Sequence, residues 1–188
     1  MNNAIMVDIE TMGTSPTAAI LAIGACRFDP SAKDDESALR AKTFDVRISL
    51  KSNTKLGRTM DPDTVTWWLT QSKEAQKGLY EGEITNLTMA LQQFRKWIEA
   101  PQTPRPTRLW AKDPDFDVVI LNNAYQSIRE RLPFHYADSR SVRTIIDVAY
   151  PDGDPPLITV GEAHKASDDA IKQALMVQHC WCKLRGCG

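Results

Sequence analysis

Three apolar runs open the chain, and polar or turn-forming segments separate them. They cover about Ala4–Glu10, Ala18–Phe28 and Lys42–Leu50, and they are rich in Ile, Val, Ala and Phe. Runs of this length and composition are typical of β-strands. The charged segment Asp29–Arg40, between the second and third runs, is predicted to be a solvated, mobile hairpin tip. A chain that begins with several strands must bury their apolar faces under helices that come later.

Helical patterns follow these three runs. Asp61-Pro62 is a typical helix start, with a capping side chain and a proline at the first helical position. A longer helix over about Glu83–Glu99 has its apolar side chains on one stripe, and prolines 101, 104 and 106 end it. The remaining expected elements are a strand over Thr107–Ala111, a helix from about Pro114, and helices over Val142–Tyr150 and Ala166–Leu184.

This order of elements predicts an α/β protein that has a central mixed β-sheet with helices on both faces. The chain has 188 residues, enough for one compact domain and too few for two of ordinary size. It contains no internal repeat and no domain-sized linker. We therefore expect one domain over residues 1–188.

Composition narrows the class of protein further. The chain has no long apolar stretch, and the apolar run after Met1 has no basic segment before it, so we expect neither a membrane span nor a signal peptide. The four cysteines are too few and too clustered for a disulfide framework, so we expect reduced thiols and a cytoplasmic location. The formal net charge is −1, without the basic excess of a protein that coats nucleic acid. An enzyme that holds one chain end through bound cations does not need that excess.

Two carboxylates end the first predicted strand, in the sequence Asp8-Ile9-Glu10. Because strand side chains alternate, Asp8 and Glu10 point to the same face. Two neighbouring carboxylates repel each other, and burial would raise their pKa values. A cation between them would relieve both costs. Taken alone, the pair is explained more simply by a strand that ends with its acids in water.

Two more acids occupy predicted helix starts. Asp113-Pro114 places Asp117 in the first turn of a helix, and His164 precedes Asp169 by five positions at the start of another. Acids in a first helical turn often only complement the helix dipole. Each signal is therefore weak when taken separately.

The ordered set of three motifs resembles the DEDD superfamily of 3′→5′ exonucleases, in its histidine-containing branch, DEDDh. The resemblance extends from Ile5 to about Ala174. The segments Asp61–Gln71 and Ser141–Ile146 are most similar to phage-type members near exonuclease A of phage T4 and to a related group of bacterial exoribonucleases. One departure is Ala111-Lys112, where members often carry Gly or Asn before the Phe-Asp pair.

The resemblance implies an RNase H-like fold and a metal-dependent 3′→5′ exonuclease. Asp8, Glu10, Asp117 and Asp169 would hold two divalent cations, Mg²⁺ or Mn²⁺, for which oxygen ligands are suited. His164 would orient the attacking water and accept its proton. The expected substrate is the 3′ end of single-stranded DNA or RNA, and the expected product is a nucleoside 5′-monophosphate.

The loop after the first motif, Thr11-Met12-Gly13, resembles the loop that contacts the terminal nucleotide in these enzymes. Gly13 allows close backbone approach, and Met12 would pack either against a base or in the core. One ring of the Trp67-Trp68 pair would stack on bases; adjacent helical residues diverge by about 100°, so the other packs in the core. We assign the groove to Trp68.

Two other functions stay open at this point. The first is a nucleic-acid binding module that has the same fold without catalysis. The second is a hydrolase of very short oligonucleotides. A homodimer is possible, and the sequence does not distinguish a DNA from an RNA substrate. A zinc site at His179, Cys180 and Cys182 is disfavoured, because no second ligand pair accompanies it.

Overall fold

The computed structural model describes residues 3–80, 82–100, 106–161 and 164–186. Within these residues, six strands form one sheet in the order β4-β3-β2-β1-β5-β6. Their bounds are β1 Ala4–Thr11, β2 Ile20–Phe28, β3 Thr43–Ile48, β4 Ile84–Thr85, β5 Arg108–Ala111 and β6 Ser139–Ser141. β1 pairs with β2 antiparallel and with β5 parallel. The predicted mixed sheet is therefore confirmed, with β1 among its central strands.

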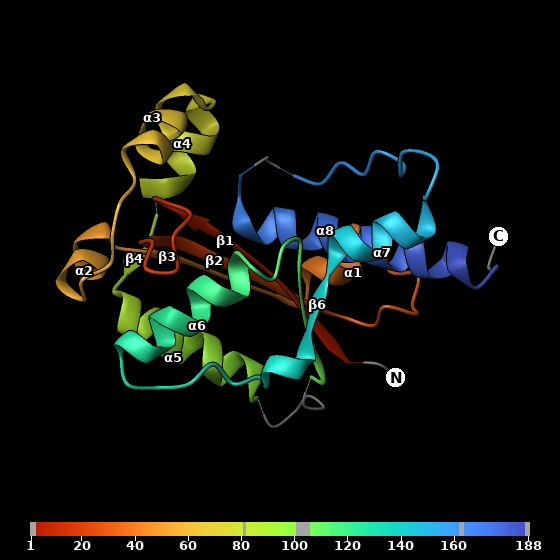
Figure 1. Cartoon of the computed structure of the whole chain (residues 1–188), viewed down its shortest axis with the longest axis horizontal. Coiled ribbons are helices and arrows are strands. Elements are labelled where there is room, and N and C mark those ends of the chain that lie inside the picture. Colours follow the sequence, from red (N-terminus) through yellow and green to blue (C-terminus); the bar gives the residue numbers. More distant parts are fainter. Residues whose placement is uncertain (1–2, 81, 101–105, 162–163, 187–188) are drawn as a thin grey trace.

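Helices cover both faces of the sheet, as the order of the elements predicted (Figure 1). α5 and α6 pack on one face; α1, α7 and α8 pack on the other, and α3 and α4 stand beyond one end. The helices are α1 Glu36–Arg40, α2 Leu50–Lys55, α3 Pro62–Thr70, α4 Lys73–Tyr80, α5 Leu87–Ile98, α6 Asp117–Ser127, α7 Val142–Ala149 and α8 Ala166–Leu184. No helix among the described residues is long and apolar enough to cross a membrane.

The alternation along β1 divides its side chains between two hydrophobic clusters. Ile5, Val7 and Ile9 join the cluster that contains the buried residues of α5 and α6. Met6 joins the cluster that contains the buried residues of α7 and α8. β1 is thus covered on both faces, so a polar side chain near its end is withdrawn from bulk water.

Several predicted boundaries were wrong because of contacts between distant segments. The helix predicted from Glu83 begins at Leu87: the Asn86 side chain accepts a hydrogen bond from Met89 N at 2.9 Å, and Ile84–Thr85 pairs with β3 instead. The helices α2 and α4 and the strand β6 were not predicted. Prolines 101 and 104, expected to end α5, lie outside the described residues.

The segment 29–40, predicted to be a solvated hairpin tip, is instead docked against α8. Its last residues form α1, in which Leu39 is fully buried. Gln178 of α8 donates hydrogen bonds to the Asp29 carbonyl at 2.9 Å and to Asp34 Oδ2 at 2.8 Å. The abundance of charge suggested solvent exposure, but one leucine and the glutamine contacts attach the segment to the core.

Candidate active site

A cavity of about 610 Å³ lies at the end of β1. The Asp8-Ile9-Glu10 pair of carboxylates lines it, and Glu10 is only 9% exposed. Its other lining residues are Lys112, Asp113, Phe116, Asp117, Arg143, His164, Asp169, Lys172 and Gln173. The four acids and the histidine singled out in the sequence thus come together from three separate parts of the chain.

Asp117 reaches the cavity as the first residue of α6. It is 3% exposed, and its Oδ1 accepts a hydrogen bond from Ile9 N at 3.2 Å. The parallel register between β1 and β5 runs only from Ala4 to Met6, so the Ile9 N–H is bonded by this side chain rather than by a neighbouring strand. The N-terminus of α6 also favours a negative charge at this position.

Asp169 and His164 reach the cavity from the start of α8. Asp169 Oδ2 accepts a hydrogen bond from His164 N at 3.0 Å, which closes the turn before the helix. His164 has a φ of 63°, in the left-handed region that side chains seldom adopt. Potential ligand atoms of Glu10, His164 and Asp169 lie within 4.8 Å of one another. The imidazole and two carboxylates therefore share one small space.

Gly24 sets the position of the first turn of α8. It pairs with Asp8 across the β1–β2 ladder, and a Cβ at Gly24 would lie 2.1 Å from the backbone of Ala166 and Ser167. Such a distance is impossible for a real side chain, so α8 packs backbone to backbone on the sheet here. This close approach brings Asp169 next to the strand that carries Asp8.

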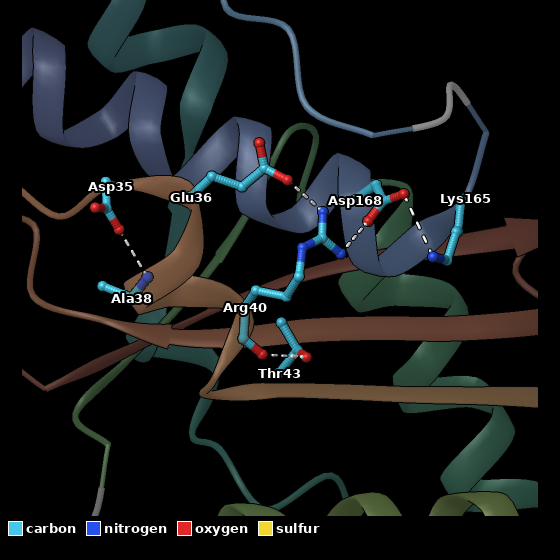
Figure 2. A network of polar contacts seen from close by, with 7 residues as sticks. All are labelled: Asp35, Glu36, Ala38, Arg40, Thr43, Lys165 and Asp168. Atoms are coloured by element: carbon cyan, nitrogen blue, oxygen red, sulfur yellow. Dashed lines mark hydrogen bonds and ion pairs between the residues drawn. The ribbon is translucent and has the colours of Figure 1, made fainter.

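A network of charged groups holds the same turn from the other side (Figure 2). Arg40 of α1 lies 2.7 Å from Asp168 Oδ1 and 2.6 Å from Glu36 Oε1, and Lys165 lies 3.4 Å from Asp168 Oδ2. The Asp168 side chain is 3% exposed, whereas that of Arg40 is 40% exposed. Asp168 therefore points away from the cavity and anchors α8 to α1, while its neighbour Asp169 points into the cavity.

Gln173, one helical turn after Asp169, contacts the acids directly. Its Nε2 donates a hydrogen bond to Asp8 Oδ1 at 2.7 Å. Its Oε1 is buried and has no hydrogen-bond partner among the described residues. Gln173 thus fixes one oxygen of Asp8 and leaves an unsatisfied oxygen of its own at the site.

Burial and charge repulsion raise the pKa values of Asp8 and Glu10, and burial raises that of Asp117. Burial, and then the charges of Asp117, Glu10 and Asp169, raise the pKa of Asp8 well above its usual value; the bond from Gln173 opposes this. Burial and the charges of Asp169 and Asp117 raise the pKa of Glu10 to about 8. Burial raises the pKa of Asp117 to about 7, although backbone hydrogen bonds oppose the increase.

This donor set fits hard divalent cations. Carboxylate oxygens dominate it, and among the residues that the structure describes one amide oxygen lacks a partner and no cysteine lines the cavity. A bound cation would favour the ionised carboxylates and offset both their repulsion and their desolvation. The geometry therefore provides an acidic site suited to metal ions.

A second cavity, of about 540 Å³, adjoins the first and shares Ile9, Glu10 and Phe116 with it. Its other lining residues are Thr11, Gly13, Thr14, Asp61, Asp63, Thr64, Trp67 and Trp68. Thr11 and Gly13 of the predicted contact loop are thus present. Met12 does not line this cavity; it packs against the buried cluster of Leu21, Trp68 and Ala75, which is the core role considered for it.

Both tryptophans line this cavity, but they differ in exposure. Trp68, which the sequence analysis assigned to the groove, is 3% exposed and donates its indole N–H to the Thr11 carbonyl at 2.9 Å. Trp67 is 43% exposed and contacts the His164 ring edge-to-face at 5.1 Å between centroids. Trp67 therefore offers the accessible ring face, and Trp68 supports the loop.

Sequence patterns did not identify Gly24, Arg40, Asp168 or Gln173 as parts of this site. Gly24 interrupts an otherwise apolar strand, which is a signal of close backbone approach. Gln173 follows Asp169 by four positions and so shares its helix face. The Arg40–Asp168 pair spans 128 positions and leaves no local pattern.

Comparisons with known proteins agree with this geometry. A family model described as the 3′-5′ exoribonuclease Rv2179c-like domain matches residues 3–181. An exodeoxyribonuclease of Enterobacteria phage T4 is 25% identical in an alignment 199 positions long, which covers 93% of this chain and 87% of the phage protein. Both relatives are of the kind that the motif resemblance predicted.

Solved structures with the same fold are nucleases. The cell-death related nuclease CRN-4 matches with a TM-score of 0.64 at 13% identity, over 95% of this chain and 63% of that one. The nuclease domain of 3′hExo, a DEDDh family member bound to rAMP, matches with a TM-score of 0.57 at 12% identity, over 99% of this chain and 94% of that one. A zinc-bound E. coli exonuclease I complex with single-stranded DNA matches with a TM-score of 0.60 at 17% identity, over 98% of this chain and 41% of that one.

The chain thus spans less than two thirds of the length of CRN-4 and of exonuclease I. The predicted RNase H-like fold of the DEDDh exonucleases is confirmed by these structures. Because the family model covers nearly the whole sequence, the chain belongs to the Rv2179c-like 3′-5′ exoribonuclease domain family and is a 3′-5′ exonuclease.

Proposed function

We propose that this enzyme hydrolyses the last phosphodiester of single-stranded RNA or DNA from the 3′ end by a two-metal-ion mechanism. Asp8, Glu10, Asp117 and Asp169 would hold the cations. The observation that carries the proposal is that these four carboxylates, from β1, α6 and α8, line one cavity together with His164. The family description supports RNA as a substrate, and the phage T4 relative supports DNA.

Mg²⁺ or Mn²⁺ fits this site better than a softer metal, because its ligands are mostly carboxylates. Two bound cations would stabilise the attacking and the leaving oxygen of an in-line phosphoryl displacement. The protein's own contribution is to hold four negative charges at fixed positions. Two dications would balance these four charges. The chain therefore needs no excess of basic residues to bind a phosphate there, and its formal net charge is −1.

His164 would accept the proton of the attacking water, since a neutral imidazole nitrogen can act as a general base. Its turn is closed by Asp169, and its ring is packed against Trp67, so the imidazole is oriented from two directions. The phosphorus–oxygen bond to the upstream 3′ oxygen breaks as water attacks. The products are a nucleoside 5′-monophosphate and a chain with a new 3′-hydroxyl.

The terminal nucleotide would occupy the 540 Å³ cavity beside the acids. Thr11 and Gly13 line it, and the exposed ring of Trp67 offers a surface on which a base can stack. Trp68 would support the loop by its hydrogen bond to the Thr11 carbonyl, and Met12 would support it by packing against the buried cluster beneath it. Stacking tolerates any base, so we expect little base preference.

We further propose that residues 1–188 form one domain that works in the reducing cytoplasm. Both hydrophobic clusters pack on the same sheet, and Cys26 and Cys180 are buried free thiols. A homodimer stays a prediction, which a mass measurement in solution tests directly.

The decisive experiment follows a 5′-labelled oligonucleotide with Mg²⁺ or Mn²⁺. The wild-type enzyme should shorten it one nucleotide at a time, and excess EDTA should stop the reaction. Asp8→Asn should abolish shortening, whereas Asp115→Asn, which removes a nearby exposed acid at the start of α6, should not. Full activity in EDTA would exclude the mechanism.

The two alternative functions have distinct outcomes in the same experiment. Tight binding without shortening in either metal would indicate a catalytically silent binding module. Cleavage that is confined to the shortest substrates would indicate a hydrolase of very short oligonucleotides. Matched single-stranded RNA, single-stranded DNA and duplex ends identify the preferred substrate.

A further inference from the structure

A third cavity, of about 360 Å³, lies between α7 and α8. Val142, Ile146 and Met176 form its apolar part. A volume of this size lies within the range of cavities that hold small ligands. Apolar side chains at this place would suit a flat, weakly polar group such as a nucleobase.

Three basic side chains, Lys112, Arg143 and Lys172, line the same cavity. All three also line the cavity that holds the four acids, together with Asp169 and Gln173. The basic group thus lies where the two cavities join, beside the position at which a phosphate would be cleaved. A second phosphate of the substrate strand, next to the one that is cleaved, would contact these three basic side chains.

The basic side chains are available to a ligand. Lys112 and Lys172 make no ion pair with any other residue in the described part of the chain. Arg143 pairs with Asp113 at 3.2 Å, but the two side chains are 62% and 47% exposed. A pair so exposed to solvent contributes little stability and exchanges readily for a phosphate.

The opposite end of the groove has the opposite charge. The 540 Å³ cavity is lined by Glu10, Asp61 and Asp63, and no Lys or Arg of the described part of the chain lines it. A terminal nucleoside with a free 3′-hydroxyl brings no phosphate to that end. The upstream strand carries one phosphate per nucleotide, so electrostatics favours its passage towards Lys112, Arg143 and Lys172.

We propose that the cavity between α7 and α8 binds the second nucleotide from the 3′ end. The phosphate on the 5′ side of that nucleotide lies among Lys112, Arg143 and Lys172, and its base lies against Val142, Ile146 and Met176. The assignment rests on the proposed exonuclease function and adds the direction of the strand and the minimum length of a good substrate. A dinucleotide with a 5′-hydroxyl lacks the upstream phosphate, so the shortest substrates that use the whole site are a 5′-phosphorylated dinucleotide and a trinucleotide.

The test compares two oligonucleotides of one sequence, in one of which the second linkage from the 3′ end is an uncharged methylphosphonate. For the wild-type enzyme, the neutral linkage should raise KM for removal of the first nucleotide about tenfold, with a smaller effect on kcat. The double variant Arg143→Gln/Lys172→Gln should have a similarly raised KM on the normal oligonucleotide. It should no longer distinguish the two substrates.

Lys96→Gln, an exposed substitution on α5 at the other face of the sheet, is the matched control and should behave as the wild type. The assignment is wrong if the double variant and the wild type discriminate equally between the two substrates. Absence of cleavage of any oligonucleotide by the wild type would instead overturn the exonuclease function itself. The two failures are therefore distinguishable.

Discussion

The two faces of the sheet deliver their acids to the site by different means. On the α6 face, Asp117 is placed mainly by a local turn at Asp113 that starts the helix, and its one distant contact is the hydrogen bond that its carboxylate accepts from Ile9 N of β1. On the α8 face, Asp169 and His164 depend on contacts with segments far away in sequence.

The two arrangements should differ in how well they tolerate substitutions. Hydrogen bonds within a helix start form wherever that helix forms, whereas the first turn of α8 is positioned by Gly24 on one side and by Arg40 on the other. Substitutions far from the cavity should therefore impair catalysis through the α8 face more than through the α6 face.

The largest effect should come from removing a ligand on either face. Asp117→Asn and Asp169→Asn should each lower kcat by at least about a thousandfold, because metal-ion stabilisation of the transition state is worth several kcal/mol. Single-turnover cleavage in Mn²⁺ measures this loss. A variant that keeps a tenth of the activity would remove that acid from the ligand set.

A smaller but still large effect is expected at Gly24. Gly24→Ala should push the first turn of α8 off the sheet, since the new Cβ has no room. A shift of about 1 Å at catalytic groups can cost about a hundredfold in rate. The matched control is Gly78→Ala in α4, where a Cβ meets nothing within 4 Å. A Gly24→Ala enzyme with normal kcat would show that α8 is not positioned by this contact.

Arg40→Met should have an intermediate effect. It leaves the buried Asp168 carboxylate with less compensation and should destabilise the protein by roughly 1–3 kcal/mol. We expect kcat to fall about tenfold with little change in KM, because the substrate does not contact Arg40. Glu36→Gln, which alters a partner of Arg40 whose side chain is 44% exposed (Figure 2), should change either quantity little. Equal effects of the two substitutions would contradict an anchoring role for Asp168.

The same contrast explains what the sequence could predict. The alternation along β1 and the helix start before Asp117 are local patterns, so periodicity and capping predicted where Asp8, Glu10 and Asp117 lie in their elements. That these acids share one site was predicted only by the resemblance to the DEDDh exonucleases. The contact of Gly24 with α8 and the Arg40–Asp168 pair depend on segments that meet only in the folded chain, and no local pattern encodes them.

The tryptophan pair shows a second limit of prediction from the sequence. Their adjacency in a helix predicted that one ring would be buried and the other accessible, because neighbouring helical side chains diverge. Which ring is buried depends on where Leu21 and Ala75 lie, and both belong to other elements. Leu39 likewise attaches a charged segment to the core, since its side chain packs in the cluster beside α8 although the charges predicted a solvated tip.

The smallest effect concerns stability without metal. Between pH 4.5 and about 8, folded Glu10 holds a proton that the unfolded chain has lost, so the metal-free protein loses stability as the pH rises through this range. Glu10→Gln should remove that loss and stabilise the metal-free protein at pH 8 by roughly 2 kcal/mol, or about 4–8 °C in Tm. Asp117→Asn should gain less, since backbone hydrogen bonds already compensate the Asp117 carboxylate. Thermal unfolding in EDTA at pH 5 and pH 8 measures both variants. If Asp117→Asn were the more stabilised of the two, the α6 face would not be the self-sufficient half of the site.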